Sequence, residues 1–142
     1  MLSKHLLIAY LFYFFAWCFD AYVTTWGLFN NYGEGNPVSR WLWSIFGWNN
    51  PFLYVGYFTV IFFFSYFLYL KISKFLGLLI FYSFGVGHVL GFLSWTPIFF
   101  KNLDLSLISK VYSILGINGL FILAPVFGVI LSFAHYKLIT RG

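Results

Sequence analysis

Four long apolar runs, separated by short stretches that carry most of the charged residues, make up the greater part of this sequence. A helix of about 20 residues crosses the apolar layer of a bilayer, so each run is expected to be a transmembrane helix. The predicted spans cover about residues 6–29, 51–70, 75–95 and 116–138. The expected fold class is therefore an all-α membrane protein, with one four-span domain over residues 1–142.

Two connections between the spans are predicted to form short helices that lie along the membrane interface. Asn36 followed by Pro37 is typical of a helix start, which predicts a helix over residues 37–46 with tryptophans at headgroup depth. A second such helix is predicted over 103–115, where serines and charged residues alternate with leucines. Other local signals are Asn50-Pro51 as the start of the second span, Thr96-Pro97 as the end of the third, and Pro125 as a kink in the fourth.

Composition supports a membrane location and argues against nucleic-acid binding. Hydrophobic residues make up 62% of the chain and charged residues only 8%, which leaves too little polar surface for a water-soluble domain. The formal charge is +5, but the basic residues stand singly at the ends of apolar runs, where they anchor helices to lipid headgroups. Five of them fall on one side of the predicted topology and three on the other. This bias predicts an integral, multi-pass protein with both termini in the cytoplasm.

The most informative polar residue is Asp20, which lies inside the first apolar run. An Asp at the centre of a span costs about 2.5–3.5 kcal/mol, so such residues usually face the interior of a bundle and have partners. Small and polar residues recur with Asp20 at helical spacing. The stripe consists of Ala9, Tyr13, Ala16, Asp20, Thr24 and Gly27. Small residues on one face permit close helix packing in lipid, so this stripe is predicted to face inward.

Asp20 and His88 are predicted to lie at the same depth. Each is about 20 Å along a helix that rises from the cytoplasmic side, so the two side chains can meet in the outer half of the membrane. Other polar residues are expected to surround them. Thr24 lies one turn beyond Asp20; the outer connection supplies Glu34, Asn36 and Arg40; and the start of the fourth span supplies Asn118.

Several chemistries fit this polar cluster. An Asp20–His88 pair is suited to general acid–base catalysis, with Glu34 as a second acid. The same three side chains would supply three metal ligands, but the sequence has no His-x3-His or Glu-x2-His motif, so no metal and no cofactor is predicted. The simpler interpretation is structural, with Asp20 paired to His88 or Arg40 and fixing the outer connection to the bundle. His5 and His135 are interpreted as ordinary interface residues.

Part of the cluster resembles the signature of a known family. The residues concerned are Asp20, Thr24, Thr25, Gly33, Glu34, Asn36, Pro37 and Arg40. They resemble an uncharacterised family of small prokaryotic multi-span membrane proteins, a domain of unknown function, whose pattern is Asp-x3-Thr, a short gap, Gly-x-Glu-x-Asn-Pro and a following basic residue. The resemblance covers mainly the first third of the chain. It implies a multi-span helical protein in which these residues act together, and it implies no particular activity, substrate or cofactor.

Three functions are considered on this basis, and lipid binding without chemistry is a remaining alternative. The leading hypothesis is a protein that acts by association, as an accessory subunit or a self-assembling bundle of a membrane complex, with lipids and other membrane chains or copies of itself as partners. The alternative is a membrane-embedded enzyme that uses Asp20, His88 and Glu34 on a lipid or peptide near the outer face. The third is an oligomeric transporter or channel. It needs several chains, because the inner half of every span is almost wholly apolar.

Overall fold

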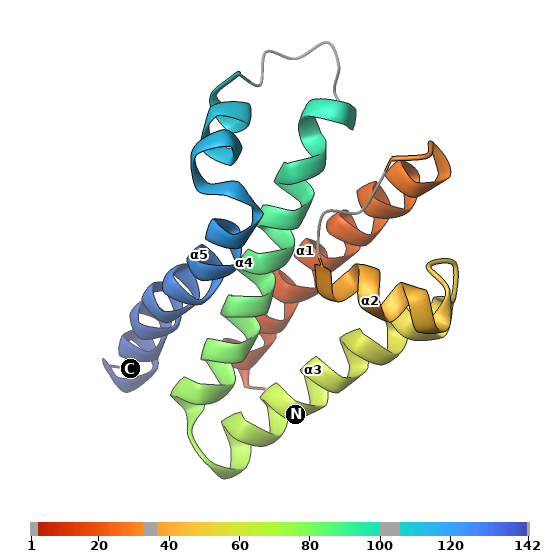
Figure 1. Ribbon diagram of the computed structural model, residues 1–142. Coiled ribbons are helices and arrows are strands. Elements are labelled where there is room, and N and C mark those ends of the chain that lie inside the picture. The colour runs from red at the N-terminus through yellow and green to blue at the C-terminus, as the bar shows by residue number, and fades with distance from the viewer. Residues whose placement is uncertain (1–2, 33–36, 100–105, 142) are drawn as a thin grey trace.

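The computed structural model describes residues 3–32, 37–99 and 106–141, and over these residues it contains five helices and no strand (Figure 1). The helices are α1 (Lys4–Phe29), α2 (Pro37–Phe46), α3 (Pro51–Lys71), α4 (Lys74–Phe99) and α5 (Ser106–Arg141). Within the described part of the chain, α1, α3, α4 and the segment Ile122–Thr140 of α5 are long and apolar enough to cross a membrane. The expected helical membrane architecture with four candidate spans is confirmed to this extent.

Local capping explains where two of the long helices begin. The Ser3 side chain accepts a hydrogen bond from the Leu6 backbone N–H at 3.2 Å and caps α1. The Asn50 side chain accepts one from the Phe52 N–H at 3.0 Å, and Pro51 occupies the first helical position of α3. The predicted start of the second span is therefore confirmed.

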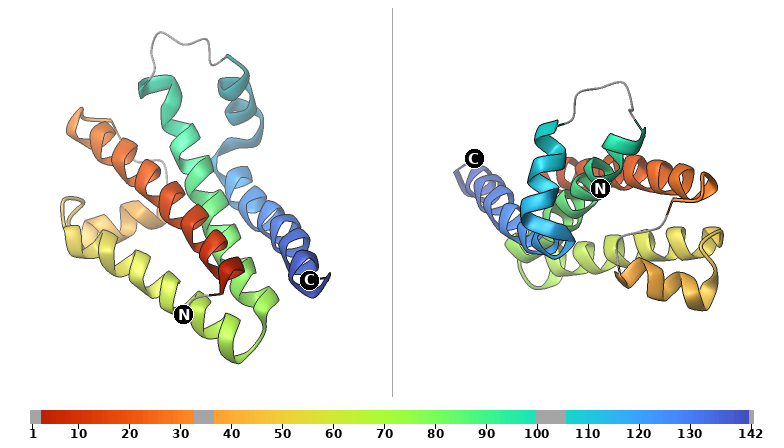
Figure 2. Two further views of the ribbon diagram at one scale, coloured as in Figure 1. Left: turned by 180° about the vertical axis from the view of Figure 1, so that it is seen from behind. Right: turned by 45° about the horizontal axis from the view of Figure 1, so that its top comes forward.

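Helix α4 is the central element of the bundle. It packs against α1, α3 and α5, whereas α1 and α3 touch each other only over part of their length. Figures 1 and 2 show α1 and α3 diverging from the end of the molecule that carries both chain termini, with α2 beside the N-terminal part of α3.

The predicted inward stripe of α1 forms the core contact with α4. Ala9 and Tyr13 are fully buried, and Ala16, Thr24 and Gly27 are also buried along the same face. The ring of Tyr13 stacks on Phe58 of α3, with ring centroids 5.1 Å apart. Close packing of this kind, rather than expulsion of water, holds transmembrane helices together in lipid.

The bounds of α4 and α5 differ from the sequence prediction, whereas those of α2 agree with it. Residues 103–115 and 116–138 were expected as separate elements, but Ser106–Arg141 is one helix that bends along its length (Figure 1), with Pro125 inside it. Helix α4 continues through Pro97 to Phe99 instead of ending at residue 95. The helix over 37–46 is confirmed as α2, while its position at the membrane interface stays a prediction.

Candidate functional site

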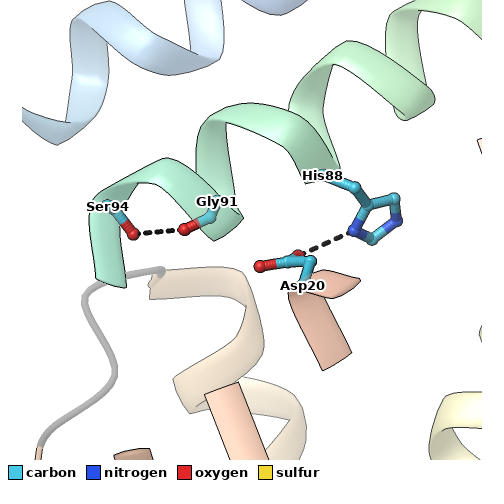
Figure 3. A network of polar contacts seen from close by, with 4 residues as sticks. All are labelled: Asp20, His88, Gly91 and Ser94. Carbon is cyan, nitrogen blue, oxygen red and sulfur yellow. Dashed lines mark hydrogen bonds and ion pairs between the residues drawn. The ribbon is translucent and has the colours of Figure 1, made fainter. Parts of the chain in front are cut away.

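Asp20 and His88 form a hydrogen-bonded pair between α1 and α4 (Figure 3). The distance from His88 Nδ1 to Asp20 Oδ2 is 2.8 Å, which is typical of a charge-assisted hydrogen bond. Asp20 lies about 24 Å from the start of α1 at Lys4, so the pair lies well inside the predicted span. The His88 side chain is 15% exposed and that of Asp20 is 20% exposed, so a small molecule can still reach the pair.

Gly91, one turn after His88 on α4, provides the space for the carboxylate. A Cβ atom at this position would lie 2.7 Å from Asp20 Oδ1 and 2.9 Å from Oδ2, closer than Cβ contacts normally come. In Figure 3 the second carboxylate oxygen points along α4 towards Gly91 and away from the imidazole. Any side chain at residue 91 would therefore displace the carboxylate from its present position.

The imidazole of His88 is held on its other side by aromatic rings. The rings of Tyr13 and Tyr57 each have their centroid 5.8 Å from that of His88, and Tyr57 meets it edge-on. His88 Nε2 is buried and has no hydrogen-bond partner among the described residues. The histidine thus presents Nδ1 to Asp20, whereas Nε2 is inaccessible from outside the bundle.

A cavity of about 540 Å³ adjoins the Asp20–His88 pair, and residues from all five helices line it. We call this cavity the chamber. Polar groups form a minor part of its wall and include Asp20, His88, Thr24 and Ser94. Aromatic side chains form much of the remainder. They are Trp17, Trp43, Tyr54, Tyr57, Phe84 and Trp95. The chamber is therefore a mainly apolar space with one carboxylate in its wall.

The predicted polar cluster is only partly assembled in the described structure. Thr24 is buried at 7% exposure and lines the chamber beside Asp20. Arg40 lies on an exposed face of α2 and forms no ion pair with any described residue, so the proposed Asp20–Arg40 pairing is wrong and His88 is the partner. Glu34 and Asn36 lie outside the described residues, and so does the side chain of Asn118.

Within the described part of the chain, no group of three or more His, Cys, Asp or Glu side chains is arranged to hold a metal ion. Asp20 and His88 supply two potential ligands, and the third ligand considered from the sequence, Glu34, lies outside the described residues. Two ligands alone do not make the three-residue set that a catalytic zinc site usually has.

Sequence reasoning missed a second polar network near the ends of the chain. His135 Nε2 lies 3.0 Å from His5 Nδ1, and His135 Nδ1 lies 2.7 Å from the Tyr82 hydroxyl. His135 is only 8% exposed and is hydrogen-bonded within the bundle, while its depth at the membrane interface stays a prediction. The sequence did contain a signal for this buried network. Gly128, Ser132 and His135 recur at spacings of four and three, as the inward stripe of α1 does, and all three are buried.

Comparison of the chain with protein-family models, with curated proteins and with solved structures gives no match. The resemblance to the family signature stays a prediction.

Proposed function

We propose that the protein binds one amphipathic molecule, taken from the surrounding lipid, with its polar head on the Asp20–His88 pair and its apolar part in the chamber. The observation that carries this proposal is the position of the hydrogen-bonded pair in the wall of the 540 Å³ cavity. Ligand sites of proteins generally enclose about 300–1,000 Å³ and combine apolar walls with a few fixed polar groups. The chamber has these properties.

The carboxylate of Asp20 is the natural anchor for the head of such a molecule. His88 occupies Oδ2, which leaves the lone pairs of Oδ1 for a donor in the chamber. Thr24 and Ser94 add hydroxyl groups to the same wall. A molecule with a hydrogen-bond donor at one end and an apolar body would therefore find complementary surfaces at both ends.

This proposal fits the geometry better than the membrane-enzyme hypothesis does. In an acid–base pair, His88 would exchange protons with a substrate through Nε2, and that nitrogen is buried against aromatic rings. Association with other membrane chains stays a prediction. Large exposed side chains such as Phe63 and Phe67 on α3 are suited to contacts with another chain and equally to contacts with lipid.

Photolabelling tests whether the chamber is occupied. The probe is a medium-chain alcohol with a diazirine in its chain, added to the purified protein in mild detergent and mapped by peptide mass spectrometry after illumination. Leu53→Trp adds bulk to the chamber wall, and Phe52→Trp is the matched control because residue 52 is 83% exposed on the neighbouring position of α3.

Binding in the chamber predicts label on its lining residues in α1 and α4, retained in Phe52→Trp and strongly reduced in Leu53→Trp. Label confined to outward-facing residues such as Phe63, with the same pattern in both variants, would contradict the proposal.

A further inference from the structure

The described residues that line the chamber include an acidic side chain but no lysine or arginine. Among these described residues, Asp20 carries the only carboxylate. Arg40 follows the lining residue Ser39 on α2, but Arg40 itself is exposed and does not line the chamber. Among the described lining residues, a head with a negative charge would therefore meet the Asp20 carboxylate without a Lys or Arg to offset it.

The aromatic side chains in the wall of the chamber also favour a positively charged head over a negatively charged one. Three tryptophans and two tyrosines line the chamber together with Asp20. They are Trp17, Trp43, Trp95, Tyr54 and Tyr57. The face of an aromatic ring attracts cations, and tryptophan does so most strongly. Sites that combine several such rings bind quaternary ammonium groups, because these large cations hold their hydration water weakly and accept ring faces in its place.

The hydrogen bond to His88 engages one of the two carboxylate oxygens of Asp20. His88 Nδ1 lies 2.8 Å from Asp20 Oδ2, whereas the other oxygen points along α4 towards Gly91 and away from the imidazole (Figure 3). A cationic head in the chamber therefore meets a carboxylate oxygen that His88 does not occupy.

We infer that the ligand of the chamber is an organic cation with an apolar body, of the quaternary ammonium or phosphonium class. This inference rests on the proposed function and narrows it to one class of molecule. The cation lies against the aromatic wall and compensates the charge of Asp20, while its apolar substituents fill the remaining space.

Two ions of matched size and opposite charge test the inference. Tetraphenylphosphonium and tetraphenylborate have the same four phenyl groups, and equilibrium dialysis in uncharged detergent, corrected with protein-free micelles, measures the binding of each. We expect saturable binding of the phosphonium, and binding of the borate at least about tenfold weaker. Equal binding of the two ions by the unaltered protein would overturn the inference without any variant.

Variants then identify the residues that cause the preference for the phosphonium over the borate. Asp20→Asn should weaken phosphonium binding about tenfold and bring the two ions towards equal affinity, whereas Thr140→Val, at an exposed position of α5 that does not line the chamber, should retain the preference. Trp43→Leu should weaken phosphonium binding several-fold. Trp48→Leu is its control, because Trp48 packs on Phe29 and does not line the chamber.

The outcomes separate this inference from the proposed function. If the diazirine alcohol labels the chamber but Asp20→Asn leaves the preference for the phosphonium unchanged, the cation inference is wrong and the binding proposal stands. If neither the alcohol nor the phosphonium binds in a way that Leu53→Trp reduces, both are wrong.

Discussion

Breaking the Asp20–His88 pair from each side should have unequal effects on stability. The variants are Asp20→Leu, His88→Phe and the double variant, each of which replaces a polar side chain by an apolar one of similar size. His88→Phe leaves a carboxyl group inside the bundle without its 2.8 Å partner. Asp20→Leu leaves a histidine that can remain neutral. We therefore expect the histidine variant to be the less stable of the two single variants.

Magnitudes follow from the depth and exposure of the pair. An unpaired carboxylate in a span costs about 2.5–3.5 kcal/mol, and the 20% exposure of Asp20 favours the lower end, so we expect a loss of about 2–3 kcal/mol for His88→Phe. A lost interhelical hydrogen bond costs about 0.6–1.7 kcal/mol, which sets the expectation for Asp20→Leu. The double variant removes both polar groups and should lie within about 1 kcal/mol of the unaltered protein.

Reversible unfolding in mixed micelles, followed by circular dichroism as denaturing detergent is added, measures these differences. The three values give an interaction energy, which we expect to be at least about 2 kcal/mol. Phe63→Leu combined with His88→Phe is the control, because Phe63 is 62% exposed on α3 and its effect should simply add. If the losses in Asp20→Leu and His88→Phe also add in their double variant, the pair is not energetically coupled and the reasoning is refuted.

Three further predictions concern packing, the second polar network and capping. Gly27→Ala should lower stability by about 1–3 kcal/mol because an indole ring packs directly on residue 27, whereas Gly56→Ala, with open space around it, should change it by less than about 1 kcal/mol. Tyr82→Phe removes the partner of His135 Nδ1 and should lower the free energy of unfolding by about 0.6–1.7 kcal/mol in the same assay. An unchanged free energy of unfolding would contradict a stabilising role for the 2.7 Å hydrogen bond. Asn50→Ala should cost about 1 kcal/mol through lost capping, and hydrogen exchange should show faster opening of the first turn of α3.

The spans and the inward face of α1 were predictable because each leaves a periodic signal in the sequence. Apolar runs of suitable length identify the helices, and the Asn50-Pro51 start signal places the beginning of α3 correctly. The small residues Ala9, Ala16 and Gly27 recur at helical spacing with Thr24, and all four are buried. In lipid, such residues are the ones that permit close approach, so their pattern predicts the packing face.

Errors arose where tertiary contacts override a local signal. Thr96-Pro97 was expected to end the third span, yet α4 continues past Pro97 to Phe99, and membrane helices tolerate proline where neighbours satisfy the freed backbone groups. The pairing of Asp20 was ambiguous for a different reason. His88 and Arg40 were both plausible partners in the sequence, and only the packing of α1 on α4 decides between them.

The chamber itself could not be predicted, since its lining residues come from all five helices. Sequence identified Asp20, but other parts of the wall come from residues on α2 and α3, such as Tyr54 and Trp43, the latter one of the tryptophans expected at headgroup depth. Which side chains share a cavity depends on helix crossing geometry, and this geometry has no simple periodic signature in the sequence.

The energetics of the pair argue that stability alone does not account for Asp20. Pairing with His88 recovers most of the roughly 2.5–3.5 kcal/mol that a carboxylate costs within a span, so the pair as a whole contributes little net stability. Two apolar residues would fill the same space between α1 and α4 with little or no loss of stability. A side chain at Gly91 would collide with the carboxylate, so the packing of α1 on α4 makes room for Asp20. A role in ligand binding accounts for a polar pair that stability does not require, so the double variant is expected to fold well and to lose binding.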